Sequence, residues 1–416
     1  MAFYAGFGKR EITPAPGTRF GGFWIERPLP AEGVHDPLRA HAMVLGDGTD
    51  TAVLVSLDLQ LVSPVLVGAV REELGKAYGI PAENVLVSAT HDHAAPGGDA
   101  AEAYYLGFDD EDVFLPKEAH GRVHEGILGA VGDAMKDRKS GTLLAGSARI
   151  AGIGKSRAGE DAEPTFPVTV LVFRDGAGKP AGALTNYPCH VSILGTGNDQ
   201  FSADWVGVLN REISTALGAP SMFLQGACAE VSTRRTRKEQ TFAEVERLGQ
   251  ELAGQVRPLF GEAVPVDTAG FFARSEEFRI PLRIAEVAAA LETSAARQAL
   301  ATPAESAGNE VRRVQFMAER FRRIAESKVD SVPAEVQVIR LGDVAIVGVT
   351  AEVHTSIAEE ILGSSPARFT LIAAPANGSV GNITPEASAT SLLGSSGVAD
   401  AVRISKDLLR AAYERR

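Results

Sequence analysis

Short apolar runs alternate with longer amphipathic segments along this chain. Each run ends in polar or glycine-rich residues, which is typical of buried strands. The predicted strands are Thr51–Leu57, Asn84–Val87, Pro167–Phe173, Ala183–Asn186, Ser221–Leu224, Val344–Val349 and Phe369–Ala373. The predicted helices between and after them, which have helix length and an apolar face, are Ser63–Tyr78, Lys117–Met135, Asp204–Leu217, Gln240–Leu259 and Val398–Tyr413. This alternation predicts an α/β fold.

The chain shows no internal repeat, low-complexity tract or linker, so we expect one domain over residues 1–416. We expect a single large multilayer α/β domain in which mixed β-sheets are flanked by helices. Residues 285–330 are rich in Ala, Glu and Arg and contain no strand candidate, which predicts a helical insertion.

Composition and charge limit the classes of binding partner that we expect. With 416 residues, 45% of them hydrophobic, the chain can bury a large core. Its net charge of −12 disfavours nucleic acid and anionic membranes, so we expect a small-molecule substrate. No apolar stretch approaches the ~20 residues of a membrane span, and the first residues lack the order of a secretory signal. We therefore expect a cytoplasmic protein, and a homo-oligomer is compatible with the sequence.

Polar side chains collect where the predicted strands end. His91 and His93 follow the strand that ends at Val87, and His190 follows the strand that ends at Asn186. Ser232 and Glu352 follow two later strands. In open α/β sheets, ligands bind beyond the carboxyl ends of strands, where loops converge. We therefore expect these side chains to line one crevice.

Zinc binds histidine nitrogens with one carboxylate, and a catalytic site keeps one position open. Two histidines and one glutamate from three strand ends would satisfy that preference. In an extended segment, His91 and His93 would lie on the same side. A His-x-His pair is also common in turns and structural hydrogen bonds, so the residues alone leave both interpretations open. We expect Cys189 and Cys228 to be buried apolar residues rather than metal ligands.

A series of ordered motifs resembles the catalytic domain of the neutral, non-lysosomal ceramidases. The motifs are Gly6–Pro14, Gly33–Leu38, Val55–Leu59, Leu86–His93, Asn186–His190, Ser202–Trp205 and Gln225–Ala227. The resemblance implies an α/β zinc amidohydrolase in which the first His of the His-x-His pair, a later His, a Glu and a Tyr bind Zn2+. Carried over to this chain, the ligands are His91, His190 and Glu352.

The resemblance also implies catalytic roles. His93 and Arg157 are expected to bind the scissile carbonyl or the product carboxylate, and Ser232 to lie near the reaction centre. Whether Ser232 orients the substrate or attacks it stays open. The implied reaction is hydrolysis of an amide by metal-activated water.

The chain departs from the family pattern at several positions. Ser379 and Asn382 stand where the tyrosine ligand is expected, so the fourth ligand is Asn382, His354 or water. Residues 386–390 replace a tyrosine-rich stretch, and a β-rich carboxy-terminal domain is not expected after Arg416. These departures predict a small polar amide rather than ceramide as substrate. Two alternatives are a metal-dependent hydrolase or lyase acting on an ester, lactone or sugar-derived substrate, and a non-catalytic metal-binding homologue.

Overall fold

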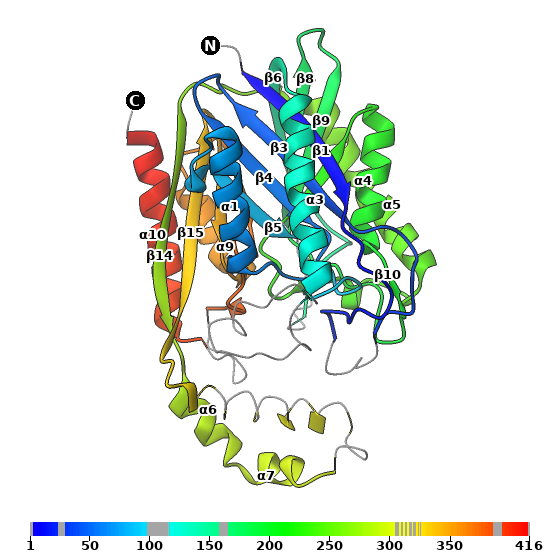
Figure 1. Ribbon diagram of the computed structural model, residues 1–416, viewed down its shortest axis with the longest axis vertical. Helices are drawn as coiled ribbons and strands as arrows, with labels where there is room; N and C mark the ends of the chain where they lie inside the picture. The colour runs from blue at the N-terminus through cyan, green and yellow to red at the C-terminus, as the bar shows by residue number, and fades with distance from the viewer. Residues whose placement is uncertain are drawn as a thin grey trace.

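The computed structural model describes residues 3–23, 30–97, 115, 117–157, 165–303, 328–385 and 393–414, with scattered positions between 308 and 327. Within these residues, nine strands form one large sheet (Figure 1). Eight of them follow one another across the sheet in the order β11 (Ser221–Gln225), β9 (Pro180–Tyr187), β8 (Phe166–Asp175), β6 (Lys139–Ile150), β1 (Tyr4–Glu11), β3 (Arg39–Gly46), β4 (Thr51–Leu57) and β5 (Val85–Ala89). The ninth strand, β13 (Val264–Pro265), pairs with β6. The pairs β9–β11 and β4–β5 are parallel and the others antiparallel, so the sheet is mixed.

A second, four-stranded sheet packs against the first. Its strand order is β14 (Phe271–Pro281), β15 (Ser331–Leu341), β16 (Val344–Val349) and β18 (Phe369–Ala373). Leu54 and Leu171 of the large sheet share one buried cluster with Ile339 and Ile346 of the small sheet. The two sheets therefore lie face to face, with an apolar core between them.

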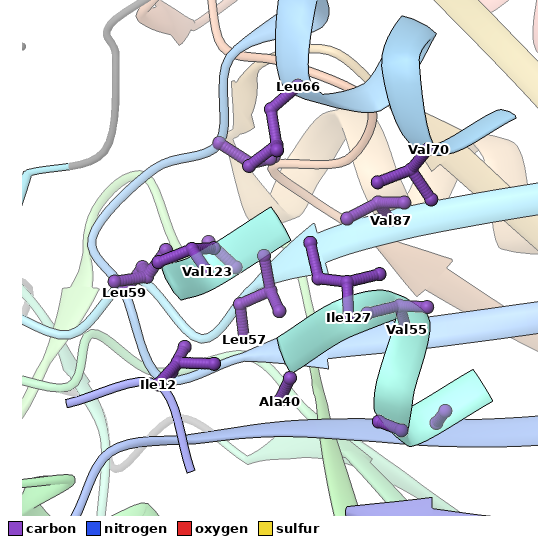
Figure 2. Packing of buried hydrophobic residues seen from close by; sticks show 14 of the residues in the cluster. Ile12, Ala40, Val55, Leu57, Leu59, Leu66, Val70, Val87, Val123 and Ile127 are labelled. Atoms are coloured by element: carbon purple, nitrogen blue, oxygen red, sulfur yellow. The ribbon is translucent and has the colours of Figure 1, made fainter. Parts of the chain in front are cut away.

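Helices cover the outer faces of both sheets. Along β4, Val53 and Val55 belong to a different cluster from Leu54, because successive strand side chains point to opposite faces. In Figure 2, Val70 of α1 (Pro64–Tyr78) lies beside Val87 of β5, and Leu66 of α1 belongs to the same buried cluster. The remaining covering helices are α3 (Lys117–Lys136), α4 (Asp204–Leu217), α5 (Phe242–Glu262), α9 (Thr355–Ser364) and α10 (Ser395–Glu414).

The result is four layers, with helices on the outside and two sheets between them. In Figure 1, α1 and α3 lie in front of the large sheet, whereas α10 lies beyond β14 and β15. A cluster of buried residues from α4, α5 and the β8–β9 strands fills the remaining outer face of the large sheet. The predicted α/β fold with mixed sheets flanked by helices is confirmed.

One segment extends away from these layers. The strands β14 and β15 pair along their whole length, and α6 (Ile284–Leu291) and α7 (Ser294–Leu300) lie between them in sequence, within the predicted helical insertion. Figure 1 shows α6 and α7 below the body of the molecule. Among the described residues, no helix combines the length and apolar character needed to cross a bilayer.

Candidate metal centre

The first candidate ligand, His91, lies two residues beyond β5. Its backbone has a φ of 63°, a left-handed conformation that non-glycine residues rarely adopt. The sequence suggested an extended segment for His91 and His93, but the pair does not lie on a regular extended strand. The Nδ1 atom of His91 lies 3.1 Å from the carbonyl oxygen of Gln60. A carbonyl can only accept, so Nδ1 of His91 donates, and its Nε2 faces the other candidate ligands.

The second candidate, His190, follows β9 and is held in the same way. Its Nδ1 lies 2.7 Å from the carbonyl oxygen of Cys228 and 3.1 Å from that of Val231. Burial lowers the pKa of His190 well below its usual value, and the nearby charges of His91, Arg157 and His93 lower it further. The imidazole is therefore neutral, with Nε2 available as a ligand.

The third candidate, Glu352, lies just beyond the second sheet, in a separate two-stranded sheet. It lies in β17 (Glu352–Val353), three residues beyond β16, and pairs with β19 (Asn382–Ile383). Its Oε2 lies 3.3 Å from Nε2 of His91 and 3.6 Å from Nε2 of His190. Burial raises the pKa of Glu352, but the charge and hydrogen bond of His91 and the charge of Arg157 outweigh burial, so the pKa is lowered. The carboxylate is therefore ionised at neutral pH.

His93 completes a cluster with the two other histidines. Its Nε2 lies 3.3 Å from Nε2 of His91, and its ring centroid lies 5.4 Å from that of His190. Ligand atoms of His91, His93 and His190 lie within 4.8 Å of one another, an arrangement found at no other group of potential ligands in the described part of the chain. The geometry therefore allows two sets of three ligands. Both contain His91 and His190, and the third ligand is either Glu352 or His93.

These residues fit a zinc ion. Ligand atoms about 2.0–2.1 Å from a tetrahedral zinc lie about 3.3 Å apart, close to the separations of Glu352 from His91 and His190. Zinc ligands must be deprotonated, and here the imidazole of His190 is neutral, the carboxylate of Glu352 is ionised, and Nδ1 of each histidine donates to a backbone carbonyl. The donor set of two nitrogens and one oxygen is one that zinc commonly uses.

Arg157 and Ser232 lie on the loops that support His190. The Arg157 guanidinium donates to the carbonyl of Ala229, and its backbone N–H donates to the carbonyl of Glu230 over 2.8 Å. Ser232 is buried, forms a backbone bridge with His190, and accepts a hydrogen bond at Oγ from the N–H of Arg234. Both residues are therefore tied to the segment that holds the imidazole of His190.

The residues considered for the fourth position have other partners. His354 precedes α9, where its Nδ1 accepts from the N–H of Ser356, and its Nε2 lies 3.5 Å from Oε1 of Glu230. Asn382 is exposed and pairs through its backbone with Glu352. The contacts of His354 favour a helix-capping role. Residues 386–390 lie outside the described residues.

Several groups that hold the two histidines could not be predicted from the sequence. The anchors of the two histidines are the backbone carbonyls of Gln60, Cys228 and Val231, and a carbonyl leaves no signal in residue identity. Cys189 and Cys228 are both free and buried. Cys228 contributes its carbonyl rather than its thiol to the support of His190.

Comparison with known proteins identifies the family. Residues 3–222 match the family model of the neutral/alkaline non-lysosomal ceramidase, N-terminal domain. This chain belongs to that ceramidase family. The match includes His91, His93, Arg157 and His190, and the resemblance inferred from the sequence motifs is confirmed.

Curated ceramidases are similar to part of this chain. Neutral ceramidase 2 of Arabidopsis thaliana is 25% identical over 227 residues, which is 50% of this chain and 30% of that protein. Neutral ceramidase of Pseudomonas aeruginosa is 25% identical over 223 residues, which is 48% of this chain and 32% of that protein. The matched region thus spans about a third of the length of these relatives.

The fold likeness extends over the whole chain. The crystal structure of neutral ceramidase from Pseudomonas aeruginosa matches with a TM-score of 0.76 and 20% identity, over 100% of this chain and 75% of that one. A ceramidase complexed with C2 matches with a TM-score of 0.77 and covers 76% of that chain. These likenesses show that the shared fold includes the second sheet and the segment beyond it that carries Glu352.

Proposed function

We propose that this chain is a zinc-dependent hydrolase that cleaves an amide bond, with His91, His190 and Glu352 as the metal ligands. The observation that carries the proposal is the convergence of their ligand atoms, with Oε2 of Glu352 within 3.6 Å of both Nε2 atoms. Membership of the ceramidase family supports amide hydrolysis.

Zinc in such a ligand set supplies Lewis acidity, which polarises an acyl oxygen and makes water a stronger nucleophile near neutral pH. The protein's part is to hold the ligands and to bind the substrate. The Nδ1 hydrogen bonds of His91 and His190 keep both Nε2 atoms close to the carboxylate of Glu352.

Three further side chains are assigned to the substrate. The proposed role of Arg157 is to stabilise negative charge on the acyl oxygen, because its guanidinium is held beside the loop that supports His190. We assign to His93, whose Nε2 lies 3.3 Å from that of His91, the exchange of a proton with the reacting amide. We assign Ser232 to orienting the substrate, since its backbone bridges His190.

The finer proposal concerns the substrate. The curated relatives are named neutral ceramidases, so an N-acyl amide is the parent substrate class. We propose a smaller and more polar amide for this chain, because Ser379 and Asn382 replace the expected tyrosine and residues 386–390 contain none. Ester, lactone and sugar-derived substrates are the alternative class.

A substrate panel tests the proposal. Chelator-treated protein is assayed against short polar amides, long-chain ceramide, esters and lactones, before and after zinc is restored. We expect zinc-dependent cleavage of a short amide, with ceramide cleaved poorly. Preferential cleavage of esters or lactones would contradict the amide assignment, and ceramide cleavage equal to the best substrate would contradict the smaller substrate. Zinc binding without any turnover would favour a non-catalytic homologue.

A further inference from the structure

Gln225 is a fully buried amide at the end of β11, directly beside the two histidine loops. Its side chain is 0% exposed. Its Nε2 donates to the carbonyl of Thr90 over 2.7 Å and to the carbonyl of Cys189 over 3.0 Å. Its Oε1 accepts from the N–H of Cys189 over 3.3 Å and from its own neighbour Gly226 over 3.0 Å. All four hydrogen-bonding positions of the amide are therefore used.

The partners of this amide are the residues directly before the candidate ligands. Thr90 precedes His91, and Cys189 precedes His190. The strands that lead to them, β5 and β9, are far apart in the strand order of the large sheet, with β5 at one edge and β9 next to the other. Gln225 thus joins two loops that the ladder of the sheet does not place side by side.

A second link joins the same loops just beyond the histidines. The N–H of His93 donates to the carbonyl of Val191 over 2.9 Å. The loops are thus connected before the histidines through Gln225 and after them through the backbone. Two links on either side of a pair of residues restrict both their separation and their relative rotation, whereas one link leaves a hinge.

We propose that Gln225 is a positioning residue that sets the separation of His91 and His190 and thereby the metal affinity of the site. This inference rests on the proposed function. The residue touches neither metal nor substrate, and its effect passes through the backbone of Thr90 and Cys189. Removing the amide leaves the carbonyls of Thr90 and Cys189 without these donors, so the loops must shift or bind water.

The chain offers a matched control in Gln337. It is also 0% exposed, lies in β15, and donates from Nε2 to the carbonyls of Glu83 and Val85 over 2.8 and 3.2 Å. These two carbonyls lie just before and at the start of β5, and Oε1 of Gln337 accepts from Nδ2 of Asn377 over 2.7 Å. Thr90, by contrast, lies just beyond the end of β5. Gln337→Met therefore removes a buried amide with the same number of donated bonds, away from the histidines.

The experiment measures zinc affinity by chelator competition and the melting temperature of the zinc-free protein, for wild type, Gln225→Met and Gln337→Met. We expect both variants to lower the melting temperature to a similar degree. Only Gln225→Met should weaken zinc binding, by at least ~10-fold, the lower end for groups that orient metal ligands. Gln225→Asn, which keeps a shorter amide, should fold more readily and show the same selective loss.

The outcomes separate the two proposals. A wild-type protein that binds no zinc would overturn both. If wild type binds zinc and Gln225→Met and Gln337→Met bind it equally well, only the role of Gln225 is overturned. Should Gln225→Met fail to fold, wild-type zinc affinity in Gln225→Asn would overturn it.

Discussion

The two sheets hold their parts of the candidate site in different ways. On the large sheet, His91 and His190 are 2% and 3% exposed, and each imidazole is fixed by a backbone carbonyl. Beyond the small sheet, the side chain of Glu352 is 13% exposed and lies on the two-residue strand β17, which follows β16 and pairs with β19. Its carboxylate reaches the histidines because the sheets pack face to face.

The imidazoles are therefore oriented in one way, and the carboxylate is brought to them in another. The histidines are oriented locally, within loops that share a buried amide and a backbone bridge. The backbone of Glu352 itself pairs with Gly381 and Asn382, and its strand reaches the loop that supports His190 through the next residue, Val353, whose carbonyl accepts from the N–H of Ala229 over 3.1 Å. We therefore expect changes near the histidines to act on the metal more strongly than changes near Glu352.

The largest effect is expected from His190→Ala. The substitution removes a ligand from the rigid part of the site, so zinc affinity should fall by more than the ~100-fold upper end for groups that only orient ligands. The protein should stay folded, because β9 and β11 pair independently of the imidazole. Elemental analysis and circular dichroism check both points. A metal-replete His190→Ala protein would mean that the ligands are misassigned.

Glu352→Gln should have a smaller effect. The glutamine keeps the shape but removes the negative charge, which should weaken zinc binding ~10- to 100-fold and shift the pH–rate profile. Activity should fall far more than stability.

Two matched variants sharpen the assignment of Glu352. His354→Ala should keep the metal, because His354 caps α9 and faces Glu230. Zinc loss in His354→Ala, together with normal zinc content and turnover in Glu352→Gln, would show that the assignment of Glu352 as a ligand from the family resemblance is wrong. Zinc loss in His93→Ala with retention in Glu352→Gln would instead favour three histidine ligands.

A pH effect on stability is expected in the histidine-bearing region, at Asp58. Burial raises the pKa of Asp58 from 3.8 to about 7, and the charge of Asp36 adds to it, although the N–H and charge of Arg39 oppose the rise. Because the folded chain holds this proton more tightly, the free energy of unfolding falls as the pH rises from 3.8 to about 7. The full difference corresponds to roughly 4 kcal/mol.

Asp58→Asn removes this titration and keeps an oxygen to accept from the N–H of Arg39. The variant should match wild type near pH 4 and exceed it in stability above pH 7. Denaturant unfolding at several pH values measures the difference. A stability difference that does not change with pH would contradict the assignment.

The smallest effect is expected near Glu352, from Thr355→Ala. Thr355 begins α9, and both its hydroxyl and its N–H donate to the carboxylate of Glu230. Alanine keeps only the hydrogen bond from the N–H. Stability should fall by about 1 kcal/mol, with zinc affinity changed no more than a few-fold. A loss of zinc as large as that of Glu352→Gln would show that this region is as rigidly coupled as the histidine loops.

The sequence predicted some elements better than others for identifiable reasons. The strands β4, β16 and β18 and the helix α4 have the predicted bounds, because each is a compact pattern with clear ends. The strand β1 was missed since Gly6, Gly8 and charged residues interrupt it. A Cβ at Gly6 would lie 2.0 Å from the carbonyl oxygen of Ala134 in α3, so the glycines allow a helix to approach the strand closely.

The candidate site could likewise be predicted only in part from the sequence. Histidines at strand ends could be found from residue type and position, and the structure brings His91, His93 and His190 together. Gln225 was recognised only as part of a motif, because its role depends on two loops that meet in three dimensions. The conformation of His91, with its left-handed φ of 63°, likewise follows from tertiary contacts rather than from the local sequence.

The most direct test of the account is the metal content of wild-type protein purified without chelators. Two imidazoles and one ionised carboxylate, whose ligand atoms converge at the edge of the large sheet, predict about one zinc per chain. Inductively coupled plasma mass spectrometry measures this ratio, with His190→Ala as the control expected to be empty. A wild-type protein with no zinc, or with the same zinc content as His190→Ala, would contradict the central claim.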